Sequence, residues 1–491
     1  MTTTHTQMRK FLGAAAVAIS AVSCRQSDID ITNPNVALTG AVASDPTALQ
    51  LLATGLVTDQ RGTRSALITN AGILGREMYT YTPQEGRNTT HFLIGITVAG
   101  KQKLDPTGFA NGSWGGQYTL LRDALNFKAT VNALASLTAA QKSAAIGFSE
   151  TLEALMIFEI AETRDSLGGI TDVKADPFVL SPFVTRDSMY KYALNFLDDA
   201  ATKLAAGGTA FPFTVPPGFA GFNTPATFTQ FNRAIKAKVA VHYATRGGGT
   251  TAWQAALTAL GASFLNAAAT TRTALDVGVY DTYAPAPDTP NPLTQATNTN
   301  LYAHMSIQAD AQLKANGQPD DRYTAKIRTG LPSRQGPTAN GGPTSAASTL
   351  GFSIWPTQSS SIPVIRNEEL ILLRAEAKLG TGDKAGAIAD LNVVRQNSGG
   401  LPASTLTAAS SDDAVITGIL YEKRFSLLME GDRWIDMRRY GKLDLLPLDI
   451  PSGPNKNFVA RVLPVPQAEC LNRLTLTAEF RGPPGIDDCA P

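Results

Sequence analysis

Paired carboxylates come closest to a catalytic pattern in this sequence. Glycoside hydrolysis needs two carboxyl groups that face each other. The candidate pairs are Asp198-Asp199, Glu368-Glu369 and Asp412-Asp413. Each pair lies on a predicted helix or at a helix end, where capping and solvation explain the charges more simply than catalysis does. The pairs therefore do not by themselves indicate a hydrolase.

The sequence contains no other recognised catalytic or metal-ligand motif. The histidines are scattered without ligand spacing, at His5, His91, His242 and His304. No G-x-S-x-G, H-E-x-x-H, P-loop or G-x-G-x-x-G pattern occurs. We therefore expect a protein that is not an enzyme and that has no cofactor and no metal site.

Composition narrows the classes of partner. The chain has 491 residues, with 42 Lys and Arg against 41 Asp and Glu, for a net charge of +1. Because there is no basic excess and no Lys- or Arg-rich run, we expect no binding to nucleic acid.

Helices that come in pairs must position the polar groups. Apolar residues recur at helical spacing, and Gly or Pro turns separate the predicted helices, which implies stacked helix hairpins. The expected helices cover residues 113–134, 142–165, 186–204, 227–245, 253–266, 367–379, 384–395 and 422–441, after a first helix that starts at Asp45-Pro46. Long polar loops lie between them, at 207–227, 276–300 and 329–361. The sequence thus predicts a mainly all-α, tetratricopeptide-like fold with a large, irregular, loop-rich lobe.

Gly380 is expected to end one helix of the C-terminal hairpin, and Thr381 or Asp383 to cap the next.

Charged residues follow a regular spacing along the predicted helix 422–441. Glu422 and Glu430 are about two turns apart, and Arg433, Asp436 and Arg439 follow at three-residue intervals that allow pairing along a helix. Two interpretations are open: a solvated charged face, or a partly buried ion network that fixes the helices and gives these five residues a structural role.

The N-terminus has the layout of a lipoprotein signal peptide. Basic Arg9 and Lys10 precede a short apolar stretch at 11–22, which ends in Ala21-Val-Ser-Cys24. We expect residues 1–23 to be removed and Cys24 to be acylated, so that the protein is anchored to a membrane without crossing it. The alternative is an ordinary cleavage site with an incidental cysteine.

The stretch 422–441 resembles the C-terminal signature of the SusD/RagB family of nutrient-binding outer-membrane lipoproteins. The matching residues are Glu422, Leu427, Glu430, Gly431, Arg433, Asp436, Arg439 and Gly441. Lys423 and Ser426 stand where the signature has Arg and Glu, which implies a weaker ion network. Further similar segments are Ile362–Ala377, Leu391-Asn-Val-Val-Arg395, Leu463–Glu469 with Asn472, and the mature start Cys24–Asn35.

The resemblance implies an architecture and a function. An acidic tether at 24–44 leads into a SusD-like domain at 45–491, with helical repeats at about 45–266 and 362–441, a loop-rich lobe at about 267–361 and a C-terminal tail at 442–491. The protein would bind a glycan or peptide nutrient at the cell surface and deliver it to a TonB-dependent, SusC-like transporter barrel in the outer membrane. A tetratricopeptide-like scaffold of an outer-membrane complex and a secreted hydrolase are the alternatives.

Aromatic residues on two loop regions are the candidate ligand contacts, because flat rings stack on sugar faces. The candidates are Tyr79, Tyr81, Arg87 and Asn88 on an early loop, and Tyr283, Tyr302, Tyr323 and Trp355 in or beside the central loops. We expect one modest site where the two regions face each other. Ordinary packing is the alternative for each aromatic residue.

Cys470 and Cys489 remain once Cys24 carries lipid. In an exported protein we expect them to form a disulfide that closes the C-terminal tail onto the body. Two unpaired thiols are the alternative.

Overall fold

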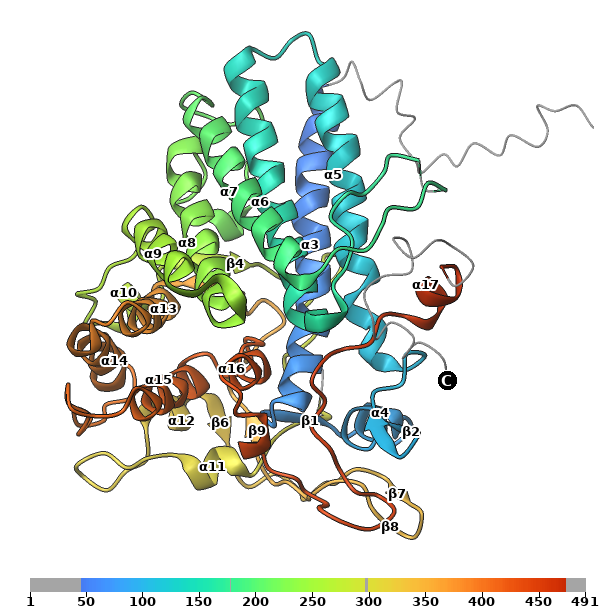
Figure 1. Ribbon diagram of the computed structural model, residues 1–491, viewed down its shortest axis with the longest axis vertical. Coiled ribbons are helices and arrows are strands. Elements are labelled where there is room, and N and C mark those ends of the chain that lie inside the picture. Colours follow the sequence, from blue (N-terminus) through green and yellow to red (C-terminus); the bar gives the residue numbers. More distant parts are fainter. Residues whose placement is uncertain (1–45, 177, 296–298, 474–491) are drawn as a thin grey trace, which may run out of the picture.

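Antiparallel helix hairpins form the upper body of the molecule, and short strands and loops form the part below them (Figure 1). The computed structural model describes residues 46–176, 178–295 and 299–473. The long helices of the body are α3 (Pro46–Leu74), α5 (Gly115–Ala133), α6 (Ala139–Arg164), α7 (Arg186–Ala205), α8 (Pro225–Tyr243), α9 (Gly249–Gly261), α13 (Asn367–Gly380) and α14 (Lys384–Asn397).

Each of these helices packs on its neighbours along the chain. α3 lies against α5, α6 against α7, α8 against α9, and α13 against α14. α5 also packs on α6, α7 on α8, and α9 on α13, so the four pairs stack into one array. From residue 144 onward α6 is almost wholly buried, because neighbouring helices cover it on several sides. This array confirms the predicted tetratricopeptide-like, mainly all-α fold.

Local capping sets several helix starts. The Thr138 side chain accepts a hydrogen bond from the Gln141 amide, and Gln141 reaches back to the Thr138 amide in a capping box. Asp383 caps α14 by accepting a bond from the Gly386 amide at 2.9 Å. Of the two predicted caps for this helix, Asp383 is the one that the structure uses.

The predicted helix 422–441 is wrong as a single element. The structure has two helices, α15 (Asp412–Ser426) and α16 (Arg433–Arg439). Between them Met429 and Gly431 adopt φ values of 63° and 95°, which a helix does not allow. Because of this turn, Glu430 does not lie where a continuous helix would place it.

The loop-rich lobe is held together by antiparallel two-stranded pairs. The pairs are β1 (Met78–Thr80) with β5 (Leu301–Ala303), β2 (Ile96–Val98) with β3 (Lys101–Lys103), β4 (Gly278–Asp281) with β10 (Ile362–Arg366), β6 (Ile327–Arg328) with β9 (Gly351–Phe352), and β7 (Thr338–Ala339) with β8 (Gly342–Pro343). The short helices of the lobe are α4 (Arg87–Leu93), α11 (Ser306–Asp310) and α12 (Asp321–Lys326). Two other short helices adjoin the array: α10 (Arg272–Leu275) packs on α13, and Cys470 of α17 (Gln467–Leu471) belongs to the core of the array. Short 3₁₀ or π turns lie at Phe109–Ser113, Asp165–Leu167, Pro217–Phe219, Ala244–Gly248 and Leu443–Leu445.

Two main hydrophobic cores correspond to these two parts. One fills the interior of the helix array, around residues such as Phe148, Phe228 and Leu370. The other lies under the loops and contains Tyr79 and Trp434. No helix among the described residues is long and apolar enough to cross a membrane.

Candidate functional site

A cleft of about 780 Å³ opens between the helix array and the loop-rich lobe. Five segments form its walls: α10 with its following turn, the β4–β10 pair, α12, the loop 353–361, and the end of α14. Glu430, from the turn between α15 and α16, lines it as well. Its volume lies within the range of about 300–1,000 Å³ that is usual for small-molecule sites.

The β4–β10 pair places the central charge of the cleft. Gly278 lies opposite Arg366 in the register of these strands. A Cβ atom at Gly278 would lie 2.3 Å from the backbone oxygen of Ile365, so only glycine permits this close approach. Arg366 directly precedes α13 and is thereby fixed at the junction of strand, helix and cleft.

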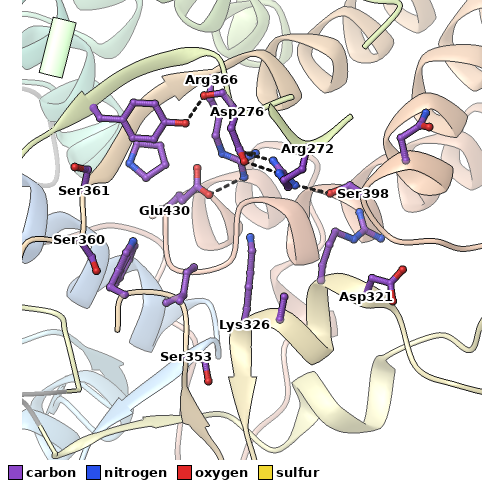
Figure 2. A pocket seen from close by; sticks show the side chains of 17 residues that line it. Arg272, Asp276, Asp321, Lys326, Ser353, Ser360, Ser361, Arg366, Ser398 and Glu430 are labelled. Atoms are coloured by element: carbon purple, nitrogen blue, oxygen red, sulfur yellow. Dashed lines mark hydrogen bonds and ion pairs between the residues drawn. The ribbon is translucent and has the colours of Figure 1, made fainter. Parts of the chain in front are cut away.

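Arg366 and Arg272 share two carboxylates on one side of the cleft. Figure 2 shows Asp276, which both guanidinium groups approach, and the second is Glu368, which the view does not draw. Arg366 pairs with Glu368 and, at 2.9 Å, with Glu430. Arg272 pairs with Asp276 and, at 2.7 Å, with Glu368. Burial alone would raise the pKa of Glu368, but the charges of Arg366 and Arg272 hold this pKa well below its usual range. The cluster is therefore charged and internally neutralised.

Two further cations reach the cleft from α12. Arg322 is buried and pairs with Asp320 at 2.6 Å and with Glu422 at 2.7 Å. The Lys326 ammonium donates to the backbone oxygens of Phe425, at 3.0 Å, and Ser426. Burial, with the nearby charge of Arg366, lowers the pKa of Lys326 to about 8.

Apolar groups and hydroxyls line the remaining walls. Trp355, Ile354, Pro363 and Tyr280 supply the apolar surface. In Figure 2, Ser353, Ser360 and Ser361 lie on the side away from Arg272 and Asp276. Hydroxyls both donate and accept hydrogen bonds, so this arrangement suits a ligand with many hydroxyl groups and some apolar surface.

Tyr79, Tyr81 and Tyr302 do come together, but inside the lobe. Tyr79 and Tyr302 are paired in the β1–β5 register. The Tyr79 and Tyr81 rings stack at 4.8 Å, and the Tyr81 and Tyr302 rings lie 5.5 Å apart. The three side chains are only 1%, 3% and 3% exposed, and the Tyr79 hydroxyl donates to Asp449 at 2.7 Å. They present no ring face to a ligand, so packing accounts for them and we do not include them in the candidate site.

The other predicted ligand contacts are dispersed. Tyr283 and Tyr323 are buried, and Arg61 lies over the Tyr283 ring. Arg87 is exposed, pairs with Glu85, and lies 4.9 Å from the centre of the Phe109 ring. Asn88 donates to the Thr82 hydroxyl at 3.2 Å. Of the eight predicted contacts, only Trp355 lines the cleft.

The signature residues lie in a buried ion network. Glu376 of α13 pairs with Arg439 and with Lys423, the latter at 3.1 Å, and Asp436 pairs with both cations at 2.8 Å. Burial alone would raise the pKa of Glu376, but the charges of Arg439 and Lys423 lower this pKa to about 2. Of the two interpretations of this stretch, the geometry matches a buried network that joins α13, α15 and α16.

Ser426 also belongs to this polar interior. Its hydroxyl donates to Glu368 at 2.6 Å and accepts from Arg322 at 3.0 Å. Lys423 makes two ion pairs. The two departures from the family signature therefore leave a connected network.

Arg433 does not take the partners that helical spacing predicts. Its guanidinium donates to the Gly75 backbone oxygen at 3.1 Å. Glu430, three residues earlier, pairs instead with Arg366. The turn between α15 and α16 separates Glu430 from Arg433, so a pairing along one helix is the wrong geometry.

Two of the three cysteines lie outside the described residues. Cys24 and Cys489 fall there, so the lipid anchor and the Cys470–Cys489 pairing stay predictions. Cys470, which is described, is disulfide-bonded.

Sequence reasoning did not find most of the cleft. The lining residues that it missed include Arg272, Asp276, Tyr280, Lys326 and Arg366. One local signal was available, since Arg272 and Asp276 stand at the i,i+4 spacing of an ion pair. The other segments meet only through the tertiary fold.

Residues 242–472 match the model of the SusD family. These residues contain every segment that lines the cleft and the whole of the signature network. This segment of the chain is similar to the SusD family. No match was found among curated proteins.

Solved structures of SusD-like proteins share the fold. A SusD-like protein from Bacteroides fragilis has a TM-score of 0.64 at 15% identity, over 88% of this chain and 96% of that one. A SusD superfamily protein from Bacteroides vulgatus has a TM-score of 0.63 at 17% identity, over 90% and 99% of the two chains. A laminarin-binding SusD-like protein has a TM-score of 0.58 at 17% identity, over 88% and 98%. The matches extend well beyond residues 242–472, so the N-terminal helices follow the SusD-like fold as well.

Proposed function

We propose that this protein is a member of the SusD family, a lipid-anchored, surface-facing binder of oligosaccharides that delivers its ligand to a SusC-like, TonB-dependent transporter of the outer membrane. The observation that carries the proposal is the cleft, which combines hydroxyls, fixed charges and the apolar surface of Trp355 and Tyr280. A laminarin-binding relative with the same fold supports a glycan as the ligand class.

The proposal is for binding rather than catalysis. The carboxylates that line the cleft are engaged, since Glu430 pairs with Arg366, Asp276 with Arg272, and Asp321 with Lys314 at 2.5 Å. A general acid must be free to approach the bond that it protonates, and cations of this chain hold these carboxylates in place.

We also propose the domain layout given by the sequence: a signal peptide at 1–23, an acidic tether at 24–44 and one SusD-like domain at 45–491. Cys24 would carry the lipid, and the tether would give the domain reach above the membrane.

A steric plug tests the cleft. Ala325 is an exposed cleft-lining residue of α12, so Ala325→Trp fills the opening without removing a buried group. Ala309→Trp on α11 is the matched control, because Ala309 is exposed and does not line the cleft. Calorimetric titration with gluco-, manno- and xylo-oligosaccharides should show a loss of about tenfold or more in affinity for Ala325→Trp alone. Equal affinities in the two variants would remove the cleft from the proposal.

Co-purification distinguishes a protein that delivers a ligand to a transporter from a scaffold of an outer-membrane complex. The native lipoprotein should bring down a large transporter barrel. Recovery of a barrel-assembly complex instead would favour the tetratricopeptide-like scaffold.

A further inference from the structure

Three consecutive apolar side chains on the loop between α6 and α7 are exposed among the described residues. Phe178, Val179 and Leu180 are 91%, 51% and 38% exposed. Apolar residues that are exposed singly need no explanation, but a contiguous group usually marks a surface that another group covers. We call these three residues the apolar tip.

We infer that the C-terminal tail of the same chain covers the apolar tip. In this arrangement residues 474–480 lie along the tip in an extended conformation, and a disulfide between Cys470 and Cys489 keeps the tail close to it. The apolar tip does not line the cleft, so this docking is independent of the proposed ligand.

The described chain ends beside the apolar tip. Val179 and Leu180 line a groove of about 340 Å³ together with Arg473, the last described residue. Arg473 is buried and donates to the Ser181 backbone oxygen at 2.8 Å. In Figure 1 the loop and α17 lie on the same side of the helix array. The tail therefore begins at the groove that the apolar tip borders, within reach of its three side chains.

The first residues of the tail have the alternation of a half-buried extended segment. Residues 474–480 read Leu-Thr-Leu-Thr-Ala-Glu-Phe. Apolar and polar residues alternate at every position, so an extended chain has all its apolar residues on one face. These residues are Leu474, Leu476, Ala478 and Phe480. Such a face is stabilised when an apolar surface covers it, and the apolar tip provides that surface where the tail begins.

The covalent closure of the tail keeps it near this surface. Cys470 of α17 is disulfide-bonded, and Cys489 is its predicted partner. The chain between the two cysteines then leaves α17 and returns to it. Gly482-Pro-Pro-Gly485, whose residues favour turns, lies within that stretch. Because a closed loop has fewer conformations than a free tail, closure lowers the entropy cost of docking residues 474–480 on the apolar tip.

A photo-crosslinking side chain at the apolar tip tests what covers it. Phe178→p-benzoylphenylalanine keeps an aromatic ring at an exposed position, so the variant should fold. After irradiation of the full-length, lipid-anchored protein, peptide mapping of the product with the mass of one chain should recover residue 178 joined to a peptide from 474–480. Leu445→p-benzoylphenylalanine is the matched control and should give no crosslink to the tail, because Leu445 is also exposed, at 64%, but lies in the turn Leu443–Leu445 beyond α16.

Any other partner of residue 178 would overturn the inference. A crosslink to lipid would make the apolar tip a membrane contact, and a crosslink to a barrel protein or to a second copy of this chain would make it an interface between proteins. The absence of any crosslink would show that the tip stays in solvent. None of these results bears on oligosaccharide binding, which Ala325→Trp tests separately.

Variants of the tail itself test which of its faces docks. Leu476→Asp places a charge on the apolar face of residues 474–480, whereas Thr475→Asp places the same charge on the polar face. We expect Leu476→Asp to lower the yield of the residue-178 crosslink about fivefold or more, because burying a carboxylate in place of a leucine is unfavourable. Thr475→Asp should keep the yield of the unchanged tail. Equal yields in the two variants would overturn the packing of the apolar face on the apolar tip.

Discussion

The Arg366 guanidinium lies 2.9 Å from the Glu430 carboxylate and joins the end of β10 to the turn between α15 and α16. Both side chains are buried. The pair connects two segments that lie 64 residues apart in the sequence, and both residues also line the cleft. The same contact therefore stabilises the fold and shapes the site.

Removing Arg366 should destabilise the protein strongly. Arg366→Ala leaves Glu368 and Glu430 as buried carboxylates with fewer partners, which costs about 3–5 kcal/mol in the free energy of unfolding. Denaturant unfolding measures this loss. Lys442→Ala, which breaks an ion pair with the exposed Asp413, is the control and should cost about 0–1 kcal/mol. Similar losses in the two variants would contradict the structural role of Arg366.

Arg433 should matter for stability more than for ligand binding. It donates to the Gly75 backbone oxygen and thereby joins α16 to the end of α3, away from the cleft. Arg433→Ala should lower the melting temperature and leave oligosaccharide affinity nearly constant. The opposite ranking of the two effects would make Arg433 part of a binding site.

The sequence predicts the local parts of this fold well. Asp383 caps α14 through a contact three residues away, and the apolar spacing of the sequence predicts most of the long helices. These features depend on neighbours within a few residues, so composition and spacing are enough to find them.

The parts that the sequence does not predict depend on distant contacts. Gly431 is compatible with a left-handed turn, but the spacing of the signature residues around it fits a continuous helix equally well. Tyr79 and Tyr302 form a buried pair only because β1 and β5 meet across more than 200 residues, as their numbering shows. The cleft likewise needs five separate segments, and of its two aromatic residues, Tyr280 and Trp355, only Trp355 is among the ligand contacts predicted from the sequence.

Stability should depend on pH through Asp281. Burial raises the pKa of this carboxyl to about 7, above the ordinary value of 3.8, despite the opposing charge of Arg64. A folded-state pKa that is raised favours the protonated form, so this group contributes stability at low pH and loses it as the pH rises from about 4 through 7.

Asp281→Asn removes that titration. Melting temperatures measured between pH 4 and pH 8 should fall less steeply with rising pH in the variant than in the wild type. Asp413→Asn, at an exposed position, should keep the wild-type slope. A slope in Asp281→Asn that matches the wild type would contradict the assignment.

Cys470 should pair with Cys489. Cys470 is disulfide-bonded, and Cys489 is the cysteine that remains if Cys24 carries lipid. A loop of this size contributes roughly 3 kcal/mol to the free energy of unfolding in the chain-entropy model. Peptide mapping of the oxidised protein should recover the linked pair, and Cys489→Ser should lower the melting temperature to that of the reduced wild type. Two free thiols in the intact mass would refute the pairing.

Cys24 should anchor the protein to the membrane. Two or more acyl chains on one residue bind a bilayer stably, whereas a single chain does so only reversibly. Cys24→Ala should therefore move the protein from the membrane fraction to the soluble fraction while its melting temperature stays that of the delipidated wild type. Ser23→Ala is the control, because it keeps a small residue before the cysteine and should leave the protein in the membrane fraction. Retention of Cys24→Ala in the membrane fraction after a salt wash would show that another contact, rather than lipid on this cysteine, holds the protein there.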